Sequence, residues 1–221
     1  MWNEFWEPIQ LSITVTIAAS AIVLLAGTTL GFVFARKTFK FKLLLETLFM
    51  LPLVLPPSVI GFLLVVIFGN QSPIGIGLKS IFGQSIIFTW YAAVISASVV
   101  AFPLMFQTAK AGFQGIHRGI EEAAIDLGAN SRQVFIRVSL PLAKKSIVAG
   151  GVLSSARALG EFGATLMFAG NIPGITQTVP TAIYMAIDSG DMFLAWAWVI
   201  TMMLLAFFLL YFVRSKEKGR N

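Results

Sequence analysis

The sequence has no cysteine, a single histidine and few charged residues. Without cysteine, the 221-residue chain can form no disulfide framework, thiolate metal site or thiol nucleophile. Charged residues make up only 12% of the chain, against roughly 25% in an ordinary soluble domain. Apolar residues reach 57%, and the mean hydropathy is +0.85. A soluble fold of this length cannot bury so much apolar surface, so the composition predicts an integral membrane protein.

Five apolar segments are each about 20 residues or longer, the length that a helix needs to cross a bilayer core of about 30 Å. Unbroken apolar runs favour helices over the short alternating strands of a membrane barrel. We therefore expect an all-α membrane protein with one transmembrane domain over residues 1–221. Five crossings are expected, or six if the apolar turn 181–187 also enters the membrane. The predicted crossings are 9–35, 43–68, 86–109, 146–169 and 193–213.

Most of the 16 Lys and Arg residues lie in three places: between the first and second segments, between the third and fourth, and after the fifth. Lys and Arg accumulate in cytoplasmic loops of membrane proteins. This distribution predicts an extracytoplasmic N-terminus and a cytoplasmic C-terminus. The net charge of +6 is thus explained by topology, and no nucleic-acid partner is expected.

The long loop 110–145 has the pattern of two short helices. Apolar residues recur at three- and four-residue spacing up to Leu127, followed by Gly128 as a C-cap and by Asn130 or Ser131 as the next N-cap. We expect a cytoplasmic helix–turn–helix, hereafter the elbow. A helical hairpin resting on the membrane surface would show the same pattern, so the composition alone leaves both interpretations open.

The elbow resembles the EAA loop of ABC importer permeases. Glu122, Ala123 and Ala124 precede Gly128, and nine residues later comes Val138-x-Leu140-Pro141, where that pattern normally has Ile for Val. The resemblance implies a type I ABC importer permease fold and an elbow that docks in a groove of a separate ATPase subunit. The ATPase-coupling residues carried over are Glu122, Ala123, Ala124, Gly128, Leu140 and Pro141.

Residues 51–62 and 156–184 are similar to molybdate permeases, the ModB family, and to their sulfate relatives. The resemblance covers most of the chain. It implies a subunit that moves molybdate across a bacterial or archaeal cytoplasmic membrane by alternating access. The implied partners are a second copy in a homodimer, two ABC ATPase subunits that use ATP and Mg²⁺, and an extracytoplasmic molybdate-binding protein. Sulfate and tungstate permeases share parts of these stretches and remain alternatives.

The chain itself offers no catalytic, metal-binding or cofactor-binding residues. A phosphate-binding loop needs G-x-x-x-x-G-K-[ST], and the nearest match, from Gly75 to Ser80, lacks the glycine before Lys79. His117 has no metal-binding companions nearby in the sequence. We therefore expect a non-enzymatic pore subunit whose energy comes from a partner.

An oxyanion is better handled by hydroxyls, backbone N–H groups and helix N-termini than by fixed charges. Prolines that interrupt a membrane helix favour the lining of a cavity over contact with lipid. Small residues also mediate ordinary helix packing, and prolines also make simple kinks, so a purely structural role stays open. The candidate pathway residues are Pro56, Pro57, Ser58, Ser155, Gly160, Gly163 and Thr165.

Arg157 and Glu161 are oppositely charged, and both lie deep in the fourth apolar segment. Their i,i+4 spacing places them on one face of a helix, where an ion pair lowers the cost of about 2.5–3.5 kcal/mol for each intramembrane charge. The pair is either a static clamp or a state-dependent contact beside the pore or a subunit interface.

Two other function classes are alternatives to an ABC permease. A secondary transporter would show inverted repeats and several intramembrane acids, whereas we find no repeat, and Glu161 is the only deep acid. A membrane assembly protein without a transport role is the other alternative. Oxyanion uptake in a deletion strain separates these classes.

Overall fold

The computed structural model describes the backbone of residues 2–218 and the side chains of residues 4–211, and this part of the chain contains helices and connections but no strand. The all-α prediction is confirmed. The helices are α1 (Trp2–Arg36), α2 (Lys42–Val54), α3 (Pro57–Phe68), α4 (Pro73–Phe82), α5 (Trp90–Gln114), α6 (Arg118–Asp126), α7 (Ser131–Val134), the π-helix η1 (Phe135–Ser139), α8 (Leu140–Leu142), α9 (Lys144–Leu159), α10 (Gly163–Phe168), α11 (Val179–Asp188) and α12 (Met192–Lys218).

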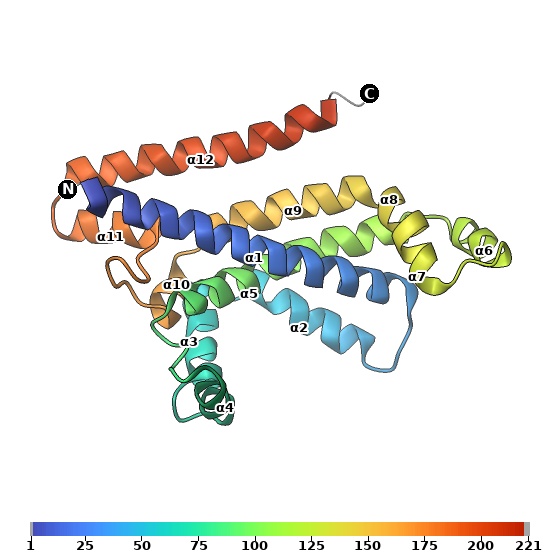
Figure 1. The fold of residues 1–221 in the computed structure, drawn as a ribbon, viewed down its shortest axis with the longest axis horizontal. Helices are drawn as coiled ribbons and strands as arrows, with labels where there is room; N and C mark the ends of the chain where they lie inside the picture. Colours follow the sequence, from blue (N-terminus) through green and yellow to red (C-terminus); the bar gives the residue numbers. More distant parts are fainter. Residues whose placement is uncertain (1, 219–221) are drawn as a thin grey trace.

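Helices α1, α5 and α9 form the centre of an elongated bundle, with α12 along one side and α2 on the other (Figure 1). Along the long axis, α1, α5 and α12 run in one direction, and α2 and α9 run in the opposite one (Figure 1). The elbow and the α1–α2 connection lie at one end, and the N-terminus and α11 lie at the other. Two of the three basic regions therefore share one end of the molecule. The basic side chains from Arg214 onward lie outside the described residues.

Small residues allow the central helices to pack closely. Gly27 and Gly31 have the G-x-x-x-G spacing that brings membrane helices into contact. A Cβ atom on Gly31 would lie 2.9 Å from the Cβ of Ala109 and 2.9 Å from the backbone nitrogen of Lys110. Around this contact, apolar side chains such as Val100 and Phe113 are buried between the helices. The bundle is thus held by close backbone approach as well as by large side chains.

Three helical stretches are long and apolar enough to cross a membrane by length and composition: Glu4–Arg36, Trp90–Gln114 and Met192–Tyr211. Counting α2 and α3 as one bent span brings the number among the described residues to four. Helix α9 has 16 residues, about 24 Å of helix, and reaches the required length only together with α10. The five crossings, and the orientation of the termini, therefore stay predictions.

The expected second crossing, 43–68, is not one continuous helix. Helices α2 and α3 meet at an angle of 119°. Proline disfavours helical dihedrals in the residue before it. Leu55 and Pro56 each precede a proline, and both are extended, with ψ of 144° and 138°. The consecutive prolines therefore end α2 and set the start of α3 in a new direction.

The expected fourth crossing, 146–169, is also interrupted. Helix α9 ends at Leu159 with Gly160 as its C-cap, and α10 begins at Gly163. The carboxylate Oε1 of Glu161 accepts a hydrogen bond from the backbone N–H of Ala164 at 2.8 Å. This bond satisfies a free donor in the first turn of α10 and so favours a new helix over a continuation of α9.

Two boundaries also differ from the sequence-based expectation. The third helix is α5, which begins at Trp90 rather than at residue 86 and runs to Gln114. The loop expected over 110–145 thus begins as the last helical turn of α5. The apolar turn 181–187 lies within the short helix α11, and a second short helix, α4, follows α3.

Candidate functional site: the elbow and the helix breaks

The elbow is a helix–turn–helix at one end of the bundle (Figure 1). Helix α6 ends before Gly128, whose φ of +90° lies in the region that glycine enters without steric cost. Asn130 then caps α7: its side chain accepts from the N–H of Gln133, and the Gln133 side chain accepts from the N–H of Asn130. The turn is therefore fixed by local sequence, as the spacing of Gly128 and Asn130 predicted.

The outer surface of the elbow carries uncovered apolar side chains. Leu127 is 89% exposed and Ile125 is 54% exposed, next to the exposed Glu122 and Ala123. Contiguous apolar surface of this kind marks contact sites for other proteins or for membranes. The remaining predicted coupling residues are Ala124 and Leu140, both half-buried, and Gly128 and Pro141, both exposed. The structure thus brings the motif onto one end of the molecule.

A polar network that the sequence analysis missed ties the elbow to the end of α1. The Arg36 Nε lies 2.7 Å from Oε2 of Glu121, and Arg36 Nη2 donates to Glu121 Oε1 at 3.0 Å. The Ser139 hydroxyl donates to the same Oε1 at 2.6 Å. We call these three residues the Arg36–Glu121–Ser139 network. Sequence reasoning used Arg36 only as a topology signal, because a charge at a helix end gives no hint of a partner 85 residues away.

Aromatic side chains reinforce the same junction. Phe135 of η1 packs against Phe32 of α1, with ring centroids 4.6 Å apart, and against Phe113 of α5 at 6.1 Å. Phe32 and Phe113 contact each other at 5.2 Å. The second arm of the elbow is therefore packed directly onto the two central helices.

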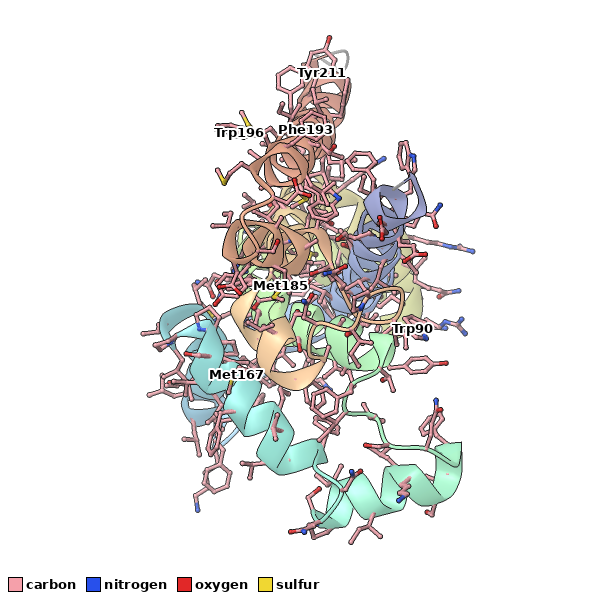
Figure 2. The ribbon with its side chains drawn as sticks, turned by 90° about the vertical axis from the view of Figure 1, so that its left-hand side faces the viewer. Trp90, Met167, Met185, Phe193, Trp196 and Tyr211 are labelled. Atoms are coloured by element: carbon pink, nitrogen blue, oxygen red, sulfur yellow. The ribbon has the colours of Figure 1, made fainter. Side chains whose placement is uncertain are left out.

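The two helix breaks lie next to each other. A Cβ atom on Gly163 would lie 3.0 Å from the Cβ of Pro57 and 3.5 Å from the backbone nitrogen of Ser58. One turn further, a Cβ atom on Gly61 would lie 2.6 Å from the Cβ of Met167. Figure 2 shows Met167 beside α3, where α10 packs against it. The starts of α3 and α10 thus meet at one place in the fold.

Arg157 and Glu161 form the expected pair, although not on one continuous helix. The Arg157 Nη1 lies 2.7 Å from Glu161 Oε2. Because α9 ends at Leu159, Glu161 belongs to the break between α9 and α10. Its side chain is 1% exposed, whereas that of Arg157 is 29% exposed. Glu161 is therefore held from two sides, by Arg157 and by the N–H of Ala164.

The remaining candidate pathway residues do not line one channel within a single chain. Pro56, Pro57, Ser58 and Gly160 are exposed at the breaks. Thr165 faces a small cavity of about 10 Å³, room for about one water, which is also lined by Ser12, Thr16, Glu161 and Thr178. Ser155 lies in a separate apolar groove of about 390 Å³ between α1, α9 and α12. Among the side chains of residues 4–211, no three His, Asp or Glu gather as metal ligands.

Helix α12 stands away from the bundle over most of its length. Figure 2 shows Phe193, Trp196 and Tyr211 on this helix, apart from the main body of side chains. Phe193 is 88% exposed and Trp196 is 60% exposed. A helix that is apolar all round needs lipid or another chain to cover it.

The sequence and the fold are similar to those of known permeases. The chain is 55% identical over 215 residues to a putative molybdenum transport system permease protein, YvgM, of Bacillus subtilis (strain 168), covering 97% of this chain and 95% of that protein. It is 42% identical over 184 residues to the molybdenum transport system permease protein ModB of Escherichia coli (strain K12), with 83% and 80% covered. A chain of a bacterial ABC transporter involved in the import of the acidic polysaccharide alginate shares the fold with a TM-score of 0.77 at 16% identity, covering 99% of this chain and 80% of that one.

The family model described as the inner membrane component of binding-protein-dependent transport systems matches residues 27–219. This range includes the elbow, both helix breaks and most of the central bundle. The structural similarity independently gives the fold of an ABC importer permease. The chain therefore belongs to the family of inner-membrane components of binding-protein-dependent transport systems.

Proposed function

We propose that this chain is the permease subunit of an ATP-driven importer that moves molybdate across a cytoplasmic membrane. The observation that carries the proposal is the elbow, whose exposed Ile125 and Leu127 lie within the EAA-like motif at one end of a membrane bundle. The substrate follows from the names of the two relatives, which are molybdenum permeases at 55% and 42% identity. Sulfate and tungstate remain the alternative substrates.

The proposed assembly holds two copies of this chain, two ATPase subunits and an extracytoplasmic binding protein. An ATPase partner is needed because the sequence contains no phosphate-binding loop. A second copy is supported by the surfaces that one chain leaves open, namely the exposed break at Pro56–Ser58 and the uncovered helix α12. Two identical walls around an axis would enclose a pathway that a single chain does not form.

The proposed mechanism is alternating access. ATP binding closes the two ATPase subunits, and the docked elbows carry that motion to the helices, which open to one side of the membrane and then to the other. The anion passes the starts of α3 and α10, where the exposed Ser58 hydroxyl can solvate it without a permanent countercharge. Glu161 and Arg157 stay paired beside this path.

The docking role of the elbow is tested by replacing Gly128 with Trp. No atom lies within 4 Å of the position of a Cβ atom on Gly128, so this chain leaves room there for a side chain to project toward a docked subunit. We expect reconstituted G128W complexes to hydrolyse ATP while molybdate uptake falls about tenfold or more. Uptake at the wild-type level would refute the assigned docking site.

Gly83 provides the matched control. It also ends a helix with a positive φ, +73°, and has no atom within 4 Å of a Cβ position, but it follows α4, away from the elbow. A Trp at Gly83 therefore brings the same backbone strain without touching the docking surface. We expect G83W complexes to transport as the wild type does. Substrate choice is measured separately, by molybdate uptake in a deletion strain with sulfate and tungstate as competitors.

A further inference from the structure

We propose that the Arg36–Glu121–Ser139 network is the connection through which the elbow moves helix α1. The inference rests on the proposed importer function and identifies the residues that carry the motion from the docking surface into the membrane. Arg36 lies in the last turn of α1, Glu121 in α6 and Ser139 at the end of η1. One carboxylate thus joins a membrane helix to both arms of the elbow.

Helix α6 depends on this carboxylate for its attachment. Within α6, all of whose residues are described, Glu121 is the only buried residue, with 9% of its surface exposed. The two large apolar residues of the same helix face outward: Ile120 is 47% exposed and Ile125 is 54% exposed. A helix with no buried apolar side chain has little hydrophobic packing to fix it to the bundle. The ion pair therefore replaces the apolar contacts that normally hold a helix in place.

The geometry suits the transmission of movement. Arg36 contacts both carboxylate oxygens of Glu121, at 2.7 and 3.0 Å, and a two-pronged contact of this kind fixes orientation as well as distance. Its Nη2 also donates to the backbone carbonyl of Ile116 at 3.3 Å, just before α6. The two side chains are only 13% and 12% exposed, so solvent screens the pair less than it screens a surface pair.

Ser139 extends the connection to the second arm. Its fully buried hydroxyl donates to Glu121 at 2.6 Å. Ser139 is also the last residue of the π-helix η1, and π-helices are rare but frequent at functional sites. Displacement of α6 by a docked subunit would therefore pull on η1 and on α1 together. The Phe32–Phe113–Phe135 contacts keep η1 packed on α1 and α5 during that displacement.

The molecule contains a matched control pair. Lys110 of α5 lies 2.7 Å from Glu46 of α2, with side-chain exposures of 14% and 19%, which are close to those of the Arg36–Glu121 pair. This second pair joins two bundle helices and contacts no residue of α6, α7 or η1 by any hydrogen bond or ion pair found among the described residues. Glu46→Gln therefore removes a comparable ion pair without affecting the elbow.

The test measures molybdate transported per ATP hydrolysed by the complete complex in liposomes. We expect Glu121→Gln to lower this ratio about tenfold while the ATPase still binds and turns over. Ser139→Ala should lower it about threefold, the effect of one lost hydrogen bond. The exchange Arg36→Glu with Glu121→Arg should recover most of the ratio, and Glu46→Gln should leave it unchanged. A residue that only stabilised the fold would change the yield of complex and not this ratio.

A covalent link between positions 36 and 121 provides a second, independent experiment. Because the chain has no cysteine, Arg36→Cys with Glu121→Cys creates a single reactive pair. Joining the two thiols with a short bifunctional thiosulfonate should restore the ratio that the unlinked double variant has lost.

The outcomes separate this inference from the proposed function. If Glu121→Gln transports as much molybdate per ATP as the wild type while G128W is uncoupled, the proposed role of the network is wrong and the importer proposal stands. Equal losses in Glu121→Gln and Glu46→Gln overturn it as well, because the effect would then be general to buried ion pairs. If the wild-type complex moves no molybdate when it hydrolyses ATP, both proposals fail together. Should Glu121→Gln not assemble, Ser139→Ala and the linked cysteine pair decide the question.

Discussion

Two consecutive carboxylates, Glu121 and Glu122, lie in different surroundings. Glu121 is buried against Arg36 and Ser139, whereas Glu122 is exposed on the elbow surface. The motif in the sequence drew attention to Glu122, which matches the pattern of the permease family. The sequence around Glu121 does not indicate its partner, because Arg36 belongs to a helix that is distant in the sequence. Residue types at a docking surface can thus be predicted from a motif, while the contacts that anchor it depend on the assembled fold.

The Arg157–Glu161 pair should respond unequally to loss of its two members. Arg157→Met leaves a carboxylate that is 1% exposed without its cation, whereas Glu161→Gln leaves an arginine that is 29% exposed and can redirect its long side chain. Removing one member of a buried ion pair lowers the free energy of unfolding by about 3–5 kcal/mol, and we expect Arg157→Met to approach that loss. The double variant should be more stable than Arg157→Met alone. Thermal unfolding in detergent measures all three, and equal losses would contradict the prediction.

Gly31 and Gly77 should give opposite results when changed to Ala. A Cβ atom at Gly31 would meet the backbone nitrogen of Lys110 at 2.9 Å, and such overpacking costs about 1–3 kcal/mol. Gly77 has no atom within 4 Å of that position and lies inside helix α4, where Ala stabilises by about 0.5–1 kcal/mol. The measurement is the melting temperature of Gly31→Ala and of Gly77→Ala in the same detergent, each compared with the wild type. Similar melting temperatures for the two variants would mean that α1 and α5 do not pack as described.

At the scale of elements, the two helix breaks were not equally predictable. Pro56 and Pro57 indicated the end of α2, because proline restricts the residue before it and removes a donor. The break after Leu159 had only Gly160 as a local signal, and the apolar run continued through it. The capping bond that the Ala164 N–H donates to Glu161 fixes this break, and it depends on a buried carboxylate whose position hydropathy does not report.

Cysteines in α3 should show which face meets water. Ser58 is exposed at the start of α3, beside Gly163, whereas Leu63 is exposed but turned by about 140° around the same helix. We expect Ser58→Cys in the assembled complex to react with a charged, membrane-impermeant thiol reagent, and Leu63→Cys to resist it. Protection of Ser58→Cys in every nucleotide state would remove this break from the pathway.

At the scale of the whole molecule, α1, α5 and α12 run along the long axis in the direction opposite to α2 and α9. The elbow and the α1–α2 connection lie together at one end, as the distribution of Lys and Arg in the sequence suggested (Figure 1). The sequence could not give the arrangement of α2, α3 and α4, because that depends on a 119° bend rather than on hydropathy. It also could not show that α12 stands apart, since apolar residues that contact lipid and those that contact protein look alike in composition.

Labelling from the two sides of the membrane tests the orientation. Thr38, in the α1–α2 connection, and Ser189, after α11, are both exposed. The α1–α2 connection and α11 lie at opposite ends of the bundle. With no native cysteine in the chain, each can carry a single one. We expect an impermeant reagent added to whole cells to label Ser189→Cys, and to label Thr38→Cys only after the membrane is opened. The reverse pattern would place the elbow outside and exclude a cytoplasmic ATPase.

The 89% exposure of Leu127 has a consequence for biosynthesis. A copy inserted into the membrane before its ATPase has been made would expose this apolar side chain to the cytosol, where chaperones and proteases recognise apolar surfaces. We call this exposed end of the elbow its tip. Balanced synthesis of the two subunits would keep that tip covered from the start. A surplus of this chain should therefore be short-lived in the cell, and its lifetime should lengthen as its partner becomes more abundant.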